Sequence, residues 1–385
     1  MHGGCIRTTM AAREAMVKRT LFVLAAACSA AVLWGVGARE SVRLSPAAMS
    51  FPAVRPAPFA SLVRRGASVM VVYADLDTTS LRVSEVPVAG ALPAVAPKPS
   101  FVDKVDIASP LGATFGLHAA AAVDGQLHLL YLDREKEDRQ LLKSVTENTG
   151  GWRLELLEPV GPPVAVLAGA DGAPLYAWAP GPLLARRASV DRQLWPALKP
   201  RGQGSVIQPA SGGDASGFAV WDDATGSLVV TRADADGLQT TVVPGAGPVH
   251  SLAQAPDGGL AVVSWDAASR RILLLERAAS GGSFVRTTVT ICDGTNGLFL
   301  AWTPEGWMFV YDEVRPAPFG RVSWELCMLT PESRTVGHPR YRRSVLSSDS
   351  RPLAGFRTLV ADGSLFVLEM REELQLLKTP LGGVD

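Results

Sequence analysis

Residues 258–266 read GGLAVVSWD: a glycine turn, an apolar run, a tryptophan and an acid. Short apolar runs bounded by turn residues are typical of buried β-strands. The flanking sequence supplies three more such segments, VHSLAQ at 249–254, ILLLERA at 272–278 and FVRTTVT at 284–290. The stretch therefore predicts one four-stranded unit whose second strand ends at Trp265.

The same phrase recurs along the chain as an internal repeat. Six further copies combine a glycine-containing turn with an apolar strand, and most of them end in an aromatic residue. The repeated position is occupied by Tyr73, Tyr131, Trp178, Trp221, Trp265, Tyr311 and Leu368. Successive members are 43 to 58 residues apart, close to the roughly 40–50 residues of a four-stranded propeller blade.

Third and fourth strands of the repeat can be recognised in several copies. Third strands are expected at residues 81–87, 141–147, 183–189, 228–234 and 322–328. Fourth strands are expected at residues 152–158, 238–244 and 342–347. No segment after residue 38 has a sustained helical period, so we expect almost no helix.

The second and third strands are apolar along nearly their whole length, so both faces of each sheet need cover. Stacking the sheets face to face around an axis provides that cover and leaves only short edges. The sequence therefore predicts an all-β β-propeller of about seven four-stranded blades. In that fold the repeated aromatic residue fills the gap between neighbouring blades; the alternative is an ordinary sandwich core.

The two ends of the repeat region predict how the ring closes. The last unit stops at its third strand, Leu374–Pro380, with only LGGVD after it. Residues 41–45, SVRLS, form a spare extended segment before the first unit. We expect this N-terminal strand to pair as the outermost strand of the last blade.

The N-terminal region has basic residues followed by an apolar run, the arrangement of a secretory signal peptide. Its basic residues are Arg7, Arg13, Lys18 and Arg19. An uncharged, mostly apolar run follows at 20–38. Two alternatives stay open, an uncleaved membrane anchor and a lipoprotein whose acceptor is Cys28. We expect an exported protein that is periplasmic, extracellular or envelope-anchored, with residues 1–38 as signal peptide or anchor and 39–385 as the propeller domain.

The net charge limits the classes of binding partner, and the cysteine content bears on whether the protein contains a disulfide. Lys+Arg and Asp+Glu both number 37, so the formal net charge is zero. Such a balance gives no field that attracts nucleic acid, and we expect membrane contact only through the N-terminal segment. Beyond residue 38 the cysteines are Cys292 and Cys327. In an exported protein they are candidates for a disulfide; the alternative is two small buried hydrophobic side chains.

One unit carries a more specific phrase, D-G-x-x-H-φ-x-Y-x-D, followed by glycine, tryptophan and glutamate. The matching residues are Asp124, Gly125, His128, Tyr131, Asp133, Gly151, Trp152 and Glu155. They resemble the repeats of secreted bacterial propellers of the sialidase-like and lectin-like kind, and this resemblance implies a propeller fold. The sialidase turn S-x-D-x-G-x-T-W is absent, and the Arg-Pro pairs inside the two VRPAPF hexapeptides, at 54–59 and 314–319, match the sialidase arginine motif poorly. No catalytic residue is carried over.

Two groups of residues are candidates for ligand contact. His118 and His250 fall at the start of first strands, near the predicted axis, where a histidine could bind a ligand or form an ordinary strand hydrogen bond. Arg340, Arg342 and Arg343 surround Tyr341 in the long sixth unit, where an insertion could stand over one face. Arginine beside an aromatic ring suits a carboxylate or sugar acid; the alternative is an exposed polar fourth strand.

The sequence implies neither a metal nor a cofactor. No H-x-x-x-H, H-E-x-x-H or CxxC spacing is present after residue 38. Paired acids occur at 75 and 77, at 222 and 223, and at 234 and 236. All fall at strand ends or turns, where Asp usually accepts hydrogen bonds from the local backbone; weak calcium binding is the alternative.

The functional expectation is a non-enzymatic binding or scaffold propeller that recognises a glycan or protein partner at the axial mouth. The alternative is a glycan-active hydrolase or lyase, which would need two carboxylates converging at that mouth.

Overall fold

The computed structural model describes a defined part of the chain. Its described residues are 41–52, 54–105, 116–134, 140–157, 163–168, 174–178, 183–187, 190–195, 205–209, 217–234, 237–316, 321–333 and 340–381. The chain divides into two units, Met1–Val42 and Arg43–Asp385. The expected signal peptide or anchor, with Cys28, lies outside the described residues.

Regular structure in the described ranges is entirely β-strand. Nothing there forms a helix long and apolar enough to cross a membrane. The expectation of an all-β protein is therefore confirmed for this part of the chain.

The first three sheets are up-and-down runs of four consecutive antiparallel strands. The first contains β3 (Pro56–Arg65), β4 (Ser68–Asp75), β5 (Ser80–Pro87) and β6 (Ser100–Lys104). The second contains β7 (Gly116–Val123), β8 (Gln126–Arg134), β9 (Gln140–Asn148) and β10 (Gly151–Leu157). The third contains β11 (Pro163–Ala168), β12 (Pro174–Trp178), β13 (Leu183–Arg187) and β14 (Val190–Trp195).

Two further runs of four are joined into one eight-stranded sheet. The first run is β15 (Ser205–Gln208), β16 (Gly217–Asp222), β17 (Ser227–Asp234) and β18 (Gly237–Val243). The second run is β19 (His250–Gln254), β20 (Leu260–Asp266), β21 (Arg271–Arg277) and β22 (Val285–Ile291). Their first strands pair in parallel through Ile207↔Leu252 and Gln208↔Ala253. Each run is otherwise antiparallel, like the other sheets.

The remaining sheets bring the two ends of the described chain together. One contains β23 (Leu298–Thr303), β24 (Gly306–Pro316), β25 (Val322–Ser333) and β26 (Arg340–Asp349). The last contains β27 (Gly355–Ala361), β28 (Ser364–Met370) and β29 (Leu374–Pro380), completed by β2 (Ala47–Phe51).

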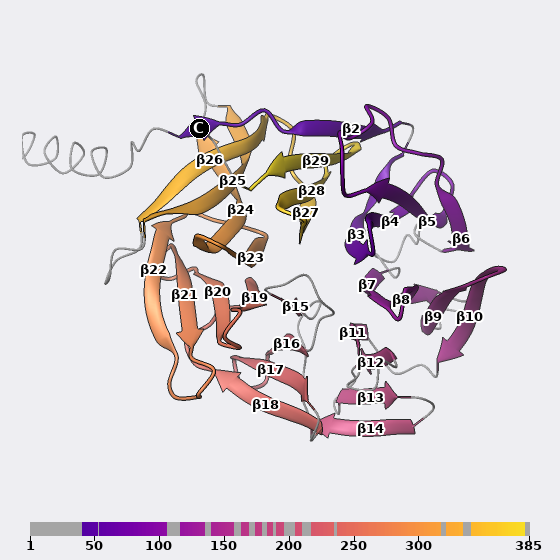
Figure 1. Cartoon of the computed structure of the whole chain (residues 1–385), viewed down its shortest axis with the longest axis horizontal. Helices are drawn as coiled ribbons and strands as arrows, with labels where there is room; N and C mark the ends of the chain where they lie inside the picture. Colours follow the sequence, from indigo (N-terminus) through magenta and orange to yellow (C-terminus); the bar gives the residue numbers. More distant parts are fainter. Residues whose placement is uncertain are drawn as a thin grey trace, which may run out of the picture. The chain divides into compact units, whose positions relative to one another are not determined.

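The first strands of successive runs follow one another in a closed circuit. β3 contacts β7, β7 contacts β11, and β11 contacts both β15 and β16. The circuit continues from β15 through β19, β23 and β27 back to β3. Within residues 43–385 the sheets are therefore stacked side by side around a centre, as Figure 1 shows. This confirms radial stacking and rules out the sandwich alternative.

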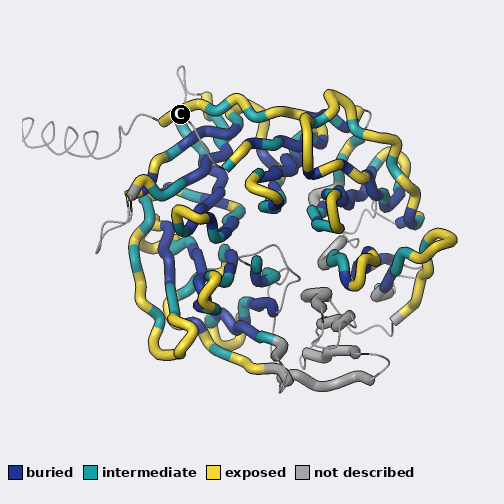
Figure 2. Tube along the Cα trace, in the orientation of Figure 1, coloured by how far each residue is buried: buried dark blue, intermediate teal, exposed yellow. Residues whose placement is uncertain are grey.

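Apolar residues fill the spaces between neighbouring sheets. One buried cluster joins the first and second sheets, and another joins the last sheet to the first. Similar clusters lie on both sides of the β23–β26 sheet. The repeated residues Tyr73, Tyr131 and Tyr311 are almost completely buried, and Figure 2 shows the buried residues gathered along the middle strands of the described sheets. The predicted inter-sheet role of these tyrosines is confirmed.

Ring closure uses a different strand from the one expected. Ser41–Ser45 was expected to complete the last sheet, but β2 does so, paired antiparallel with β29 from Ala47↔Lys378 to Phe51↔Leu374. Leu44 instead donates its backbone N–H to Val345 O on β26, at 3.0 Å. The reason is side-chain pattern, because Met49 and Phe51 are buried whereas Ser41, Val42 and Arg43 are exposed.

The long sixth unit contains no inserted element among its described residues. Its extra length is taken up by β24, β25 and β26, which have 11, 12 and 10 residues. The two VRPAPF copies are also not equivalent, because one leads into β3 and the other ends β24.

Candidate functional site

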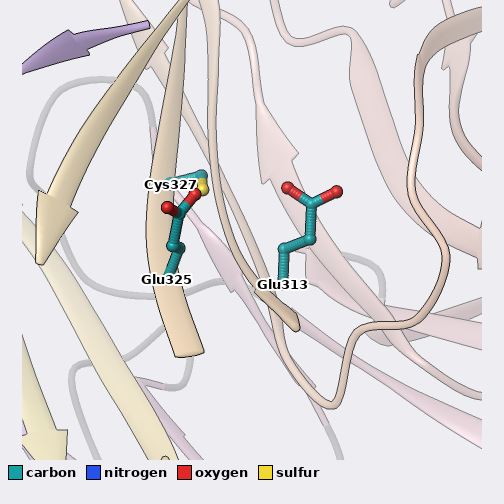
Figure 3. A group of neighbouring side chains, drawn as sticks. All are labelled: Glu313, Glu325 and Cys327. Carbon is teal, nitrogen blue, oxygen red and sulfur yellow. The ribbon is translucent and has the colours of Figure 1, made fainter. Parts of the chain in front are cut away.

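A polar cluster lies where β24 and β25 run side by side. Glu313 on β24 is the register partner of Glu325 on β25, and Tyr311 is the partner of Cys327. Because side chains alternate along a strand, all four project from one face of the sheet. Figure 3 shows Glu325 and Cys327 on one strand with Glu313 opposite them; one ligand atom from each of these three lies within 4.8 Å of the others.

Arg343 on β26 occupies the middle of this cluster. Its Nη2 donates to Glu313 Oε2 at 3.0 Å, to Glu325 Oε2 at 2.7 Å and to Cys327 Sγ at 2.8 Å. Its Nε donates to the Tyr311 hydroxyl at 3.3 Å. One guanidinium therefore holds the two carboxylates, the thiol and the phenol together.

A second arginine connects the cluster to solvent. Arg315 Nε lies 2.9 Å from Glu313 Oε2 and 3.4 Å from Glu325 Oε2. Its side chain is 41% exposed, against 11% for Glu313 and 13% for Glu325. Two guanidiniums thus balance two carboxylates, which is the condition for burying such charges without a large penalty.

Burial keeps the uncharged members of the cluster protonated. Desolvation raises the pKa of the Cys327 thiol to about 12, although the nearby Arg343 works in the opposite direction. Desolvation also raises the pKa of Tyr311. At neutral pH Cys327 is a thiol, not a nucleophilic thiolate.

The same residues do not fit a metal centre as they stand. Glu313, Glu325 and Cys327 are of the types that ligate a divalent metal, but all three bond to the one Nη2 atom of Arg343. A cysteine binds a metal as its thiolate, whereas Cys327 is protonated. The cation held by these groups is the guanidinium of Arg343.

A related cluster stands at the same place in the second sheet. Asp133, like Glu313, follows its tyrosine by two residues, and it bonds to Lys143 on β9. Lys143 Nζ also bonds to Asp103 Oδ2 at 2.9 Å, and Tyr131 donates to that oxygen at 2.6 Å. Asp103 belongs to β6 of the neighbouring sheet, whereas Glu325 belongs to the same sheet as Glu313. Of these two clusters, the one in the sixth unit carries both carboxylates on adjacent strands.

The histidines expected near the axis do lie on inner strands. His250 begins β19, and its Nδ1 faces Pro248 O at 2.9 Å. Desolvation lowers the pKa of His250 to about 4. Its Nε2 is buried and has no hydrogen-bond partner among the described residues. His118 lies in β7, at a register shift between Leu117 and Ala119, and its side chain is outside the described part.

The three arginines around Tyr341 do not form one site. Tyr341 is buried edge-on against Phe309, with ring centroids 5.1 Å apart. Arg343 lies on the same face of β26 and enters the cluster, while Arg340 and Arg342 are exposed. The separation follows from the two-residue period of a strand, which sends alternate side chains to opposite faces.

The two candidate disulfide cysteines are free, buried thiols. Cys292 follows β22, and its Sγ donates to Gly294 O at 3.4 Å. Desolvation raises the pKa of Cys292 to about 12. The structure therefore corresponds to the alternative of two small buried side chains, packed in the same apolar cluster.

Acids at the ends of second strands act as turn caps. Asp75 accepts from the backbone N–H of Asp77 and from the Thr78 hydroxyl. Asp222 and Asp266 make the corresponding pairs of bonds in their own turns. This is the expected structural role; Asp236 lies outside the described residues.

The glycan-active alternative required two carboxylates at the axial mouth, and the described inner strands provide none. The inner strands β3, β7, β11, β15, β19, β23 and β27 contain no Asp or Glu within their bounds. The close pair Glu313 and Glu325 lies off this centre, between second and third strands. Sequence reasoning missed it because Glu325 is recognised only once the β24–β25 register is known.

Comparison with known proteins identifies structures of similar fold but no sequence family. No sequence family matches the chain, and no curated protein does either. An ancestral GH74 enzyme matches with a TM-score of 0.53 and 10% identity over 86% of this chain and 49% of its own, so this chain spans about half its length. YCF48 bound to D1 peptide matches with a TM-score of 0.53 and 11% identity over 90% of this chain and 99% of its own.

A sialidase from Trypanosoma rangeli is also among the matches, with a TM-score of 0.45 and 11% identity over 89% of this chain and 60% of its own. The expected fold-level resemblance to sialidase-like propellers is confirmed. At such identities the likeness shows the fold alone.

The main functional expectation is corrected by these matches. Of the matches with a TM-score above 0.5 described above, one is a glycoside hydrolase, the ancestral GH74 enzyme. The expectation of a non-enzymatic binding or scaffold propeller therefore has no support from these matches, and the activity of this chain is a matter for proposal.

Proposed function

We propose that this chain is a seven-bladed propeller that hydrolyses glycosidic bonds, with Glu313 and Glu325 as its two carboxyl groups. The count of seven treats the eight-stranded sheet as two blades, which meet only through the short parallel contact of β15 with β19. The proposal for hydrolysis rests on the geometry of the carboxylate pair.

The observation that carries the proposal is the separation of the two carboxyl groups. A ligand oxygen of Glu313 lies within 4.8 Å of one of Glu325. Retaining glycoside hydrolases hold their two carboxyl groups about 5–5.5 Å apart, whereas inverting enzymes need roughly 6.5–9.5 Å to admit a water. The pair lies closer than the inverting range, so it leaves no room for a water between the carboxyl groups, and we propose a retaining reaction through a glycosyl-enzyme intermediate.

The surrounding charges suggest a role for each carboxyl group. Glu313 receives two close guanidinium contacts, from Arg343 at 3.0 Å and from Arg315 at 2.9 Å. With both guanidiniums within 3.0 Å, Glu313 is assigned as the nucleophile. Glu325 contacts the same two arginines, Arg343 at 2.7 Å and Arg315 at 3.4 Å, and its looser contact with Arg315 leaves it the role of acid and base.

The remaining members of the cluster hold the substrate and the carboxylates. Arg343 is a positioning residue, because one Nη2 atom fixes both carboxylate oxygens. Tyr311 is almost completely buried and accepts from Arg343, so it helps to hold the guanidinium in place. Arg315 is the half-exposed member through which a substrate would approach. The partner is accordingly a glycan, and we propose that the N-terminal segment exports the protein to meet it.

The test is glycosidase activity of the full chain on a panel of aryl glycosides and oligosaccharides. Glu313→Gln and Glu325→Gln should each reduce kcat at least a hundredfold, since each removes one of the two reacting groups. Asp133→Asn is the matched control, because it alters the related cluster of the second sheet and should leave kcat unchanged. Turnover that survives either glutamine variant, or a folded wild type inactive on the whole panel, would contradict the proposal.

A further inference from the structure

The closing strand β2 is held along both of its edges. One edge pairs with β29 of the last sheet. On the other edge Ser50 N–H donates to Ala94 O at 3.0 Å, and Ala96 N–H donates to Ser50 O at 2.9 Å. Residues 94–96 belong to the connection between β5 and β6. The connection from the first sheet therefore forms backbone hydrogen bonds to β2, the strand that completes the last sheet. Figure 1 shows β2 beside β29.

A lysine fixes the start of that same connection. Lys378 on β29 donates from Nζ to Val88 O and to Gly90 O, both at 2.6 Å. Its ammonium also lies 5.3 Å from the ring centroid of Phe366. Within the described part of the chain, these hydrogen bonds go to backbone carbonyls and none goes to a carboxylate.

Side-chain packing ties β2 to the first sheet as well. Phe51 meets the repeated residue Tyr73 edge-on, with centroids 5.4 Å apart. Met49 and Phe51 share one buried cluster with residues of the first and last sheets. The strand is therefore paired by its backbone to one sheet and packed by its side chains against the next.

We infer that residues 88–96, called the strap below, hold β2 in place, and that Lys378 anchors the strap through its hydrogen bonds to Val88 O and Gly90 O. When these bonds are lost, β2 separates locally from its neighbours. β2 has five residues, and a strand this short is held mainly by its edges and its few buried side chains. Local opening at such an element takes less free energy than global unfolding. Release of the strap would free β2 while leaving the other sheets folded.

Lys378 bonds to uncharged carbonyl groups, and this distinguishes its contacts from a nearby ion pair. Arg64 Nη2 lies 2.7 Å from Asp362 Oδ1 and joins the same two sheets, with both side chains partly exposed. Salt screens an exposed ion pair, whereas an ammonium held by carbonyl groups makes no ion pair to screen. Opening at β2 should therefore depend little on ionic strength.

Hydrogen exchange of the full chain, read by mass spectrometry, tests the inference. Lys378→Met keeps the apolar stem and removes the donors, and Ala96→Pro removes the N–H that bonds Ser50. Each should speed exchange in residues 47–51 about tenfold, the effect of losing one or two hydrogen bonds, at low and at high salt. Lys98→Met, an exposed lysine of the same connection, is the control and should change nothing.

Two results would overturn the inference. One is unchanged exchange in residues 47–51 in both variants, which would mean that the strap does not hold the strand. The other is equal acceleration in the strands of every sheet, which would mean that the ring unfolds as a whole. The denaturation midpoint of each variant is measured in parallel. An unchanged midpoint indicates local opening at β2, and a lowered midpoint indicates loss of stability of the whole ring.

Discussion

Arg343 Nη2 donates to Glu325 Oε2 at 2.7 Å, reaching from the fourth strand of its sheet to the third. The same nitrogen also donates to Glu313, so Arg343 is the buried one of the two arginines that hold the carboxylates together. This arrangement makes the cluster sensitive to single substitutions, and it sets the first prediction.

Replacing Arg343 by Met should destabilise the protein by about 3–5 kcal/mol, because the two carboxylates lose their buried guanidinium partner and keep only the half-exposed Arg315. Arg342→Met is the matched control, since Arg342 is the adjacent residue on β26 and is exposed; it should change stability by less than about 0.5 kcal/mol. Urea denaturation followed by tryptophan fluorescence measures both. Equal stabilities for the two variants would refute the role given to Arg343.

The thiols of Cys292 and Cys327 should not react with an aromatic disulfide reagent in the native protein at pH 8. Both are buried and their pKa values are raised to about 12, so almost no thiolate is present to attack. In denaturant both should react at once. Rapid labelling of either thiol in the folded state, or an intact-mass value two daltons low, would show this account of the cysteines to be wrong.

His250 should make the fold acid-sensitive. Its pKa is lowered from 6.5 to about 4 by desolvation, so the unfolded chain binds a proton more readily than the folded one. The stabilising contribution is complete above pH 6.5 and is lost as the pH falls towards 4, by up to about 1.4 kcal/mol for each unit. His250→Gln should flatten the dependence of the unfolding midpoint on pH over this window; a slope equal to that of the wild type would contradict the prediction.

Gly217 should not tolerate a side chain. A Cβ atom there would lie 2.4 Å from Thr231 O and 2.7 Å from the Ile207 side chain. Gly217→Ala should therefore lower stability by roughly 1–3 kcal/mol, the usual cost of overpacking. Gly294→Ala is the control, because a Cβ atom at that position would meet nothing within 4 Å. The melting temperatures of both variants test the prediction. Equal values would show that the structure near Thr231 accommodates a Cβ atom at residue 217 without loss of stability.

Much of the fold could be predicted from local patterns. The strand ending at Trp265 and its partners were visible as apolar runs between turns, and β20, β21 and β22 lie within a residue or two of the expected ranges. The Asp124-Gly125 turn has both residues at positive φ, 55° and 75°, as a tight hairpin with this dipeptide requires. Such features depend only on neighbours in sequence.

The remaining features depend on contacts between distant segments. Ala47–Phe51 replaced residues 41–45 as the closing strand because the cores of the first and last sheets receive Met49 and Phe51, which no local pattern reveals. Glu313 was visible two residues after a repeated tyrosine, but Glu325 joins it only through the β24–β25 register. The arginine cluster divided between two faces because the register of β26 places Arg343 alone inward.

The most direct test of the proposed hydrolase is to trap its glycosyl-enzyme intermediate. The full chain is incubated with the 2-deoxy-2-fluoro derivative of the sugar that the panel identifies, and the labelled peptide is mapped by mass spectrometry. The account predicts one sugar bound covalently to Glu313. A label on Glu325 or on any other carboxylate, or turnover with no trapped intermediate, would contradict it.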